Sequence, residues 1–156
     1  MKIMKFGIPC LMFLTVLVFP AFAGDMPGPD AAELWTYVTE IEPYGEWGQW
    51  PDHQDMQPGR SPHGPLHVIR VNDAALTKGH PKPSGAIVVK ENFSSEKELM
   101  AITVMYKVKD YNPMAGDWFW VKYSPDGTVL KEGKPKGCIA CHGARADEDY
   151  IMVSDY

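Results

Sequence analysis

The chain carries the sequence Cys138-Ile139-Ala140-Cys141-His142 close to its C-terminus, and this motif constrains the fold more than any other feature. A Cys-x-x-Cys-His run is typical of covalent c-type haem attachment. The two thiols add to the haem vinyl groups, and the adjacent imidazole binds the iron. In a helical turn, residues at this spacing place both sulfurs beside one porphyrin edge. A haem in this position would add a large apolar face to the core of the domain.

Other interpretations of the two cysteines require features that the chain lacks. The chain has 3 cysteines in all, so it offers no second cysteine pair for a structural zinc site. A thioredoxin-type redox pair follows a strand near the start of a βαβ pattern, whereas this motif lies near the end of the chain. Haem attachment is the favoured interpretation, and a disulfide or a zinc site remains as the alternative.

Residues 1–23 have the pattern of a cleavable signal peptide. Lys2 and Lys5 make a basic start, an apolar run follows, and Ala21-Phe22-Ala23 gives the small-residue end. The apolar run is shorter than the roughly 20 residues of a membrane-spanning helix. We expect cleavage after this segment, one haem domain over residues 24–156, no membrane association after cleavage, and a periplasmic location, where c-type haem is attached.

Cleavage would also change the cysteine content and the charge. Cys10 would be lost, so both remaining cysteines belong to the haem motif. Loss of the two signal-peptide lysines lowers the formal net charge from −5 to −7. An acidic surface argues against nucleic acid and anionic membranes as partners, and it permits a basic soluble redox partner. Asp147, Glu148 and Asp149 are predicted to form an exposed acidic patch for such a partner.

The body of the chain has the pattern of one helix followed by several strands. Asp30 could cap a helix whose apolar residues continue to Ile41. Segments rich in β-branched and aromatic residues predict strands at 67–71, 86–93, 101–108 and 118–123, and a helical turn is predicted at 73–76. We therefore predict an α+β domain with an antiparallel sheet, an N-terminal helix and a C-terminal haem-binding segment.

This order of elements differs from that of the usual small electron-transfer cytochromes c. Those proteins are helical, carry the haem motif near the N-terminus and take a methionine ligand from further along the chain. Here Met152 is the only methionine after His142, and it follows too closely to reach the opposite haem face. The chain therefore has the pattern of a β-rich c-type haem protein.

Several short segments occur in the order found in cytochrome P-460 and cytochrome c′-β proteins. They are His63-Gly64-Pro65, Asn72-Asp73-Ala74-Ala75, Gly85 with Val89-Lys90-Glu91, Tyr106-Lys107-Val108, Gly116-Asp117-Trp118-Phe119, Tyr123-Ser124-Pro125-Asp126-Gly127 and the haem motif. The chain resembles this family over nearly the whole predicted domain. The resemblance implies a β-sheet domain that holds one haem c through its C-terminal motif, with His142 as the proximal iron ligand, and it implies a homodimer.

Lys90 makes the resemblance chemically specific. In cytochromes P-460 a lysine in this strand is covalently joined to a haem meso carbon, and hydroxylamine is oxidised. Cytochromes c′-β lack this link and bind nitric oxide or carbon monoxide. Strand alternation places Ala86, Val88 and Lys90 on one face. A solvated lysine near a strand end is the alternative, and the resemblance favours a position at the haem edge.

The distal side of the haem is less constrained by the sequence. A sixth iron ligand would have to come from His53, His63, His67, His80 or a methionine, although loop histidines are more often surface residues. The resemblance implies an open distal position, which suits catalysis or gas binding. Further residues expected near the haem are Arg70 on a strand, Glu132 as a distal base, and Phe93, Tyr106, Trp118 and Trp120 as pocket walls.

Two classes of function follow from the resemblance. The first is an enzyme that oxidises hydroxylamine, with nitric oxide as a further small ligand, at a haem linked to Lys90, and passes electrons to a soluble cytochrome. The second is a protein that binds or carries nitric oxide without the link. A simple electron carrier is the third alternative.

Overall fold

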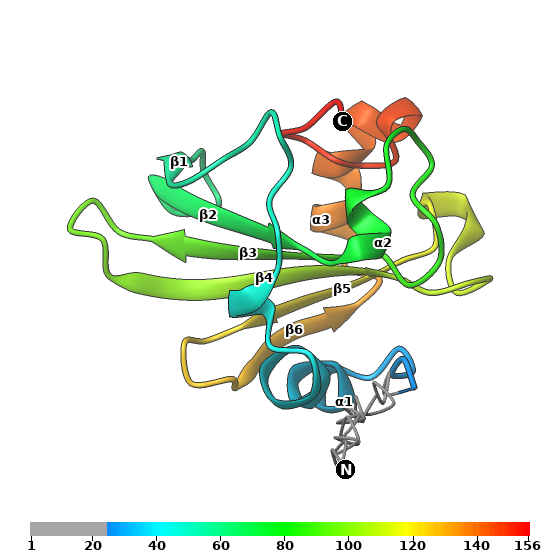
Figure 1. The fold of residues 1–156 in the computed structure, drawn as a ribbon, viewed down its shortest axis with the longest axis horizontal. Helices are drawn as coiled ribbons and strands as arrows, with labels where there is room; N and C mark the ends of the chain where they lie inside the picture. The colour runs from blue at the N-terminus through cyan, green and yellow to red at the C-terminus, as the bar shows by residue number, and fades with distance from the viewer. Residues whose placement is uncertain (1–24) are drawn as a thin grey trace, which may run out of the picture.

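A computed structural model describes residues 25–156, which form one six-stranded antiparallel sheet with short helices on both sides (Figure 1). The predicted signal peptide lies outside the described residues. Each strand pairs with its neighbour in the chain, and the order is β1 Gln57–Pro58, β2 Leu66–Val71, β3 Ile87–Phe93, β4 Leu99–Lys107, β5 Trp118–Tyr123 and β6 Val129–Gly133. The predicted α+β class and antiparallel sheet are confirmed.

The four predicted strands correspond to β2, β3, β4 and β5, with ends that agree within two residues. The two edge strands were not predicted. Strand β1 has only two residues, and one of them is Pro58. Four of the five residues of β6 are exposed, so no alternation of apolar and polar residues marks this strand in the sequence.

The helices are short. In α1, Ala31–Thr36, the Asp30 carboxylate caps the first turn by accepting hydrogen bonds from the backbone N–H groups of Ala32 and Glu33, both at 2.9 Å. The predicted helical segment does end at Ile41, but its second half, Tyr37–Ile41, is a π-helix. The other helices are α2 Asp73–Leu76, α3 Lys136–His142, and 3₁₀ segments at Tyr44–Glu46, Pro113–Ala115 and Gly143–Glu148. Within residues 25–156, none has the length and apolar character required to span a membrane.

The sheet has two differently covered faces, which we name after the helices that lie on them. On the α1 face, Ile87 and Val89 pack with Leu34 and Val38 of the N-terminal helical segment. On the α3 face, the alternate residue Val88 packs in a second core with Met105, Trp118 and Trp120, against α3 and the C-terminal segment. Figure 1 shows α1 on one side of the sheet and α3 on the other.

Candidate haem site

Helix α3 presents the two thiols of the haem motif one turn apart. Cys138 and Cys141 are three residues apart and therefore lie on the same side of the helix. Both cysteines are free; Cys138 is half-buried against the α3-face core and Cys141 is exposed. Burial raises the pKa of the Cys138 thiol. Among residues 25–156, no group of three or more His, Cys, Asp and Glu side chains is arranged to hold a metal ion.

His142, the last residue of α3, is oriented by the C-terminal segment. Its Nδ1 lies 2.8 Å from the carbonyl oxygen of Tyr150. Because a carbonyl oxygen only accepts hydrogen bonds, Nδ1 carries the proton and Nε2 keeps its lone pair. The ring of Trp120 packs against the imidazole with centroids 4.7 Å apart. Burial lowers the pKa of His142 and so favours the neutral form that binds metals.

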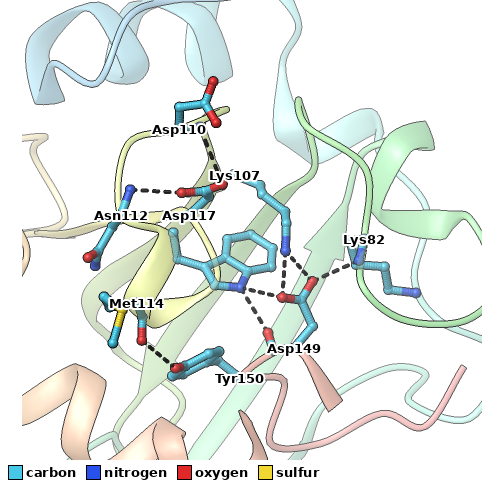
Figure 2. A network of polar contacts seen from close by, with 9 residues as sticks. Lys82, Lys107, Asp110, Asn112, Met114, Asp117, Asp149 and Tyr150 are labelled. Carbon is cyan, nitrogen blue, oxygen red and sulfur yellow. Dashed lines mark hydrogen bonds and ion pairs between the residues drawn. The ribbon is translucent and has the colours of Figure 1, made fainter. Parts of the chain in front are cut away.

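A buried ion pair holds the segment that provides the Tyr150 carbonyl (Figure 2). The Asp149 carboxylate accepts hydrogen bonds from Lys107 Nζ and from the backbone N–H of Lys82, and the Asp149 carbonyl accepts one from Trp118 Nε1 at 2.8 Å. Asp149 and Tyr150 have positive φ angles of 55° and 65°. Residues other than glycine adopt this conformation at a cost, which the surrounding contacts offset.

Lys90 lies on the α3 face and shares it with Ala86 and Val88, as strand alternation predicted. Its cross-strand neighbours are Ile69 on β2 and Thr103 on β4. The side chain is half-buried, and burial lowers the pKa of its amine to about 8. Lys90 forms no ion pair with any described residue. Its charge contributes to the lowered pKa of His142, so the amine and the imidazole share one electrostatic environment.

Three of the four histidines that the sequence offered as sixth ligands gather on the α3 face. His53 stacks on His67, with their Nε2 atoms 2.8 Å apart. His63 faces His142, with ring centroids 6.4 Å apart. Burial is the main cause of pKa values of about 4 for His63 and His67, so both imidazoles are neutral at pH 7. His80 lies apart from this group, nearer to the ion pair of Figure 2.

The structure corrects three predicted positions. Arg70 pairs with Val89 and therefore lies on the α1 face. Glu132 pairs with Val121 and is on that face as well. Tyr106 is buried in the α1-face core. Successive side chains along a strand point to opposite faces of the sheet, so a residue next to one on the α3 face lies on the α1 face. These three side chains therefore lie on the side of the sheet opposite the haem motif.

Two further predictions are corrected in part. Among the expected pocket walls, Trp118 and Trp120 lie in the α3-face core, whereas Phe93 ends β3 at a register shift and belongs to neither core. The predicted acidic patch loses one member, because Asp149 is only 4% exposed. The segment needs this carboxylate inside the protein to pair with Lys107, and Glu148 pairs with Arg145, so Asp147 is the exposed member of the predicted patch.

Sequence reasoning missed the contact that orients His142. Tyr150 acts through its backbone carbonyl, and no side-chain pattern marks such a role. A signal for the ion pair did exist, because Lys107 interrupts the apolar end of a predicted central strand. A lysine at a buried strand position needs an anionic partner, since an unpaired buried charge is costly.

The α3 face fits a covalently attached haem. It combines two free thiols one turn apart, an imidazole whose Nε2 is available to a metal, and the apolar side chains of the second core. Two buried polar atoms on this face, Trp120 Nε1 and His67 Nδ1, have no hydrogen-bond partner within residues 25–156. Buried polar atoms are normally paired, so the face is suited to a further group with polar substituents.

The sequence matches the Cytochrome P460 family over residues 42–153, a range that contains the whole sheet, α3 and Tyr150. The chain belongs to the cytochrome P460 family. Membership of this family implies that the chain binds haem. No curated protein matches the chain.

Proposed function

We propose that this cytochrome P460 family protein is a periplasmic mono-haem c-type cytochrome that oxidises hydroxylamine. Cys138 and Cys141 would hold the haem, His142 Nε2 would bind the iron, and Lys90 would be linked to the haem edge. The observation that carries the proposal is the position of Lys90. It is a half-buried amine, without an ion-pair partner among the described residues, on the same sheet face as His142.

Burial also prepares Lys90 for covalent chemistry. Only the neutral amine of a lysine is a nucleophile. With a pKa of about 8, roughly a tenth of the amine is neutral at pH 7, against less than roughly 0.1% for an ordinary lysine. The lowered pKa therefore increases the population of Lys90 in the neutral, nucleophilic form.

The haem would supply a redox-active iron, and the chain's own residues would orient and shield it. The hydrogen bond from His142 Nδ1 to the Tyr150 carbonyl fixes the plane of the imidazole and increases the basicity of Nε2. The Asp149 ion pair holds that carbonyl in place. The ring of Trp120 packs against the imidazole and keeps water from that side.

One observation favours a second candidate function, nitric oxide binding without the Lys90 link. Oxidation of hydroxylamine releases protons, and a base near the substrate would accept them. Glu132, the expected base, lies on the α1 face. The imidazoles of His63 and His67 have pKa values of about 4 and are weak bases at pH 7. Gas binding requires no proton acceptor.

A soluble cytochrome would take the electrons from the proposed enzyme. The exposed Asp147 follows α3 and provides an acidic group for a basic partner surface, whereas the half-buried Glu148 pairs with Arg145. The homodimer implied by the family resemblance stays a prediction.

Replacement of Lys90 by leucine tests the proposal against a matched control. Lys122 pairs with Thr103, which pairs with Lys90, so Lys122 stands in the same row of the α3 face. Lys90→Leu should abolish hydroxylamine turnover and shift the haem absorption spectrum, whereas Lys122→Leu should preserve both. Unchanged turnover in Lys90→Leu would contradict the proposed role of Lys90. A wild-type protein that binds nitric oxide and has no turnover would favour the second candidate.

A further inference from the structure

His63 and His142 are spaced on the α3 face like two ligands of one metal ion. Their ring centroids are 6.4 Å apart, and their planes are at 88°. With metal–nitrogen bonds of about 2.0 Å, two imidazoles on opposite sides of one metal ion have centroids roughly 6 to 6.5 Å apart. The two rings therefore have the separation expected of two axial ligands.

The backbone around His63 holds the ring in this position. The His63 N–H donates to the carbonyl of Arg60 at 3.0 Å and closes a turn. A Cβ atom on Gly64 would lie only 2.2 Å from the carbonyl oxygen of Phe93, so glycine alone permits this approach of the loop to β3. The His-Gly-Pro segment thus anchors to the sheet the loop that carries the imidazole.

The other histidines are less suited to bind an iron opposite His142. The Nε2 atoms of His53 and His67 contact each other at 2.8 Å, which engages both rings in one pair. His67 is also only 2% exposed. His80 lies outside the group on the α3 face. His63 is therefore the one histidine that the structure places directly against the His142 ring.

We propose that His63 binds the haem iron opposite His142 in the resting oxidised protein. The inference rests on the haem attachment proposed above, and it is independent of the Lys90 link and of hydroxylamine turnover. It differs from the open iron position that the family resemblance implies. A small ligand would have to replace the imidazole, so that one iron–nitrogen bond breaks as the new bond forms, with no change in oxidation state.

Spin-state measurements on the oxidised holoprotein test this assignment. Electron paramagnetic resonance should show a low-spin iron in the wild type and a high-spin iron in His63→Ala. Added imidazole should restore the low-spin signal in His63→Ala. Because the competing ligand is gone, cyanide should bind this variant faster, by at least about tenfold. His80→Ala is the control and should keep the wild-type signal.

Several results would overturn the assignment. They are a high-spin iron in the wild type, a low-spin iron in His63→Ala, or a loss of the low-spin signal in His67→Ala alone. If His63→Ala does not fold, Gly64→Ala serves as the second variant, because it should displace the loop and give a mixture of high-spin and low-spin iron. A purely low-spin signal in Gly64→Ala would then contradict the proposal. An absence of hydroxylamine turnover or of the Lys90 link would alter none of these spectra, so the two proposals fail separately.

Discussion

The two faces of the sheet bury different kinds of side chain. The α1 face is an apolar core whose polar groups are satisfied within the chain. The hydroxyl groups of Tyr106 and Tyr123 each donate a hydrogen bond to a backbone carbonyl at 2.7 Å. On the α3 face, Lys90 has no anionic partner among the described residues, and Trp120 Nε1 and His67 Nδ1 have no hydrogen-bond partner.

This difference separates stability from function within one sheet. A core that only stabilises a fold can satisfy its own polar groups, because it is complete without a ligand. On the α3 face, the half-buried Lys90 amine, the two free thiols, Trp120 Nε1 and His67 Nδ1 have no partner among the described residues. We therefore expect changes on the α1 face to affect stability alone, and changes to the α3-face residues that contact or orient the haem motif to affect the haem as well.

The largest effect is expected at the buried ion pair of the α3 face. Asp149→Asn leaves the Lys107 ammonium buried without a counter-charge and should lower the free energy of unfolding by about 3–5 kcal/mol. It should also shift the haem absorption spectrum, because the Tyr150 carbonyl loses its support. Urea unfolding and absorption spectra measure the two effects. The double variant Lys107→Met/Asp149→Leu removes both charges and should recover most of the lost stability. A loss of stability below about 1 kcal/mol in Asp149→Asn alone would contradict the account.

A slightly smaller loss of stability is expected on the α1 face. Leu34 is fully buried in that core, and Leu34→Ala should cost about 3 kcal/mol through the lost contacts and the cavity left behind. The haem absorption spectrum should be unchanged. A spectral shift in this variant as large as that of Asp149→Asn would remove the distinction between the two faces.

The pH dependence of stability tests the burial of Lys90. Its pKa is about 8 in the folded protein and about 10.5 in the unfolded chain, so the unfolded chain binds more protons between these values. The free energy of unfolding of the wild type, relative to Lys90→Leu, should therefore rise from about pH 8 to about pH 10.5 and be constant below pH 8. Urea unfolding of protein with an unlinked Lys90 measures this difference. A difference that stays flat across the whole range would show that Lys90 is not buried.

The smallest effect is expected at Glu132. This exposed residue lies on the α1 side of the edge strand β6. Glu132→Gln should change the free energy of unfolding by less than about 0.5 kcal/mol and leave any hydroxylamine turnover unchanged. A large loss of turnover would instead return Glu132 to the site as its base.

Local patterns in the sequence account for what could be predicted. The haem motif and the β-branched runs are local signals, and strand alternation grouped Lys90 with Ala86 and Val88 because it has a period of two residues. The same alternation places Arg70 on the opposite face of the sheet from its neighbours Ile69 and Val71. Only the strand register in the structure shows which of these two faces carries α3. Glu132 lies in β6, an edge strand without a hydrophobic pattern, so no face could be assigned to it.

Long-range contacts account for what could not be predicted. Asp149 looks like one of three exposed acids in the sequence, yet it pairs with Lys107, which is 42 residues earlier in the chain. The facing positions of His63 and His142 likewise depend on a loop folded back against β3. Lys107 in a predicted strand signals that an anionic partner is needed but not which residue supplies it, and no periodic pattern marks the loop.

Mass analysis of the denatured and digested holoprotein tests the central claim most directly, namely that the α3 face holds a covalently attached haem with Lys90 at its edge. Haem should remain with the protein through denaturation, because thioether bonds do not depend on the fold. The peptide that contains Cys138 and Cys141 should carry the haem mass and be joined through it to the Lys90 peptide. Release of the haem on denaturation, with both cysteines unmodified, would contradict the account.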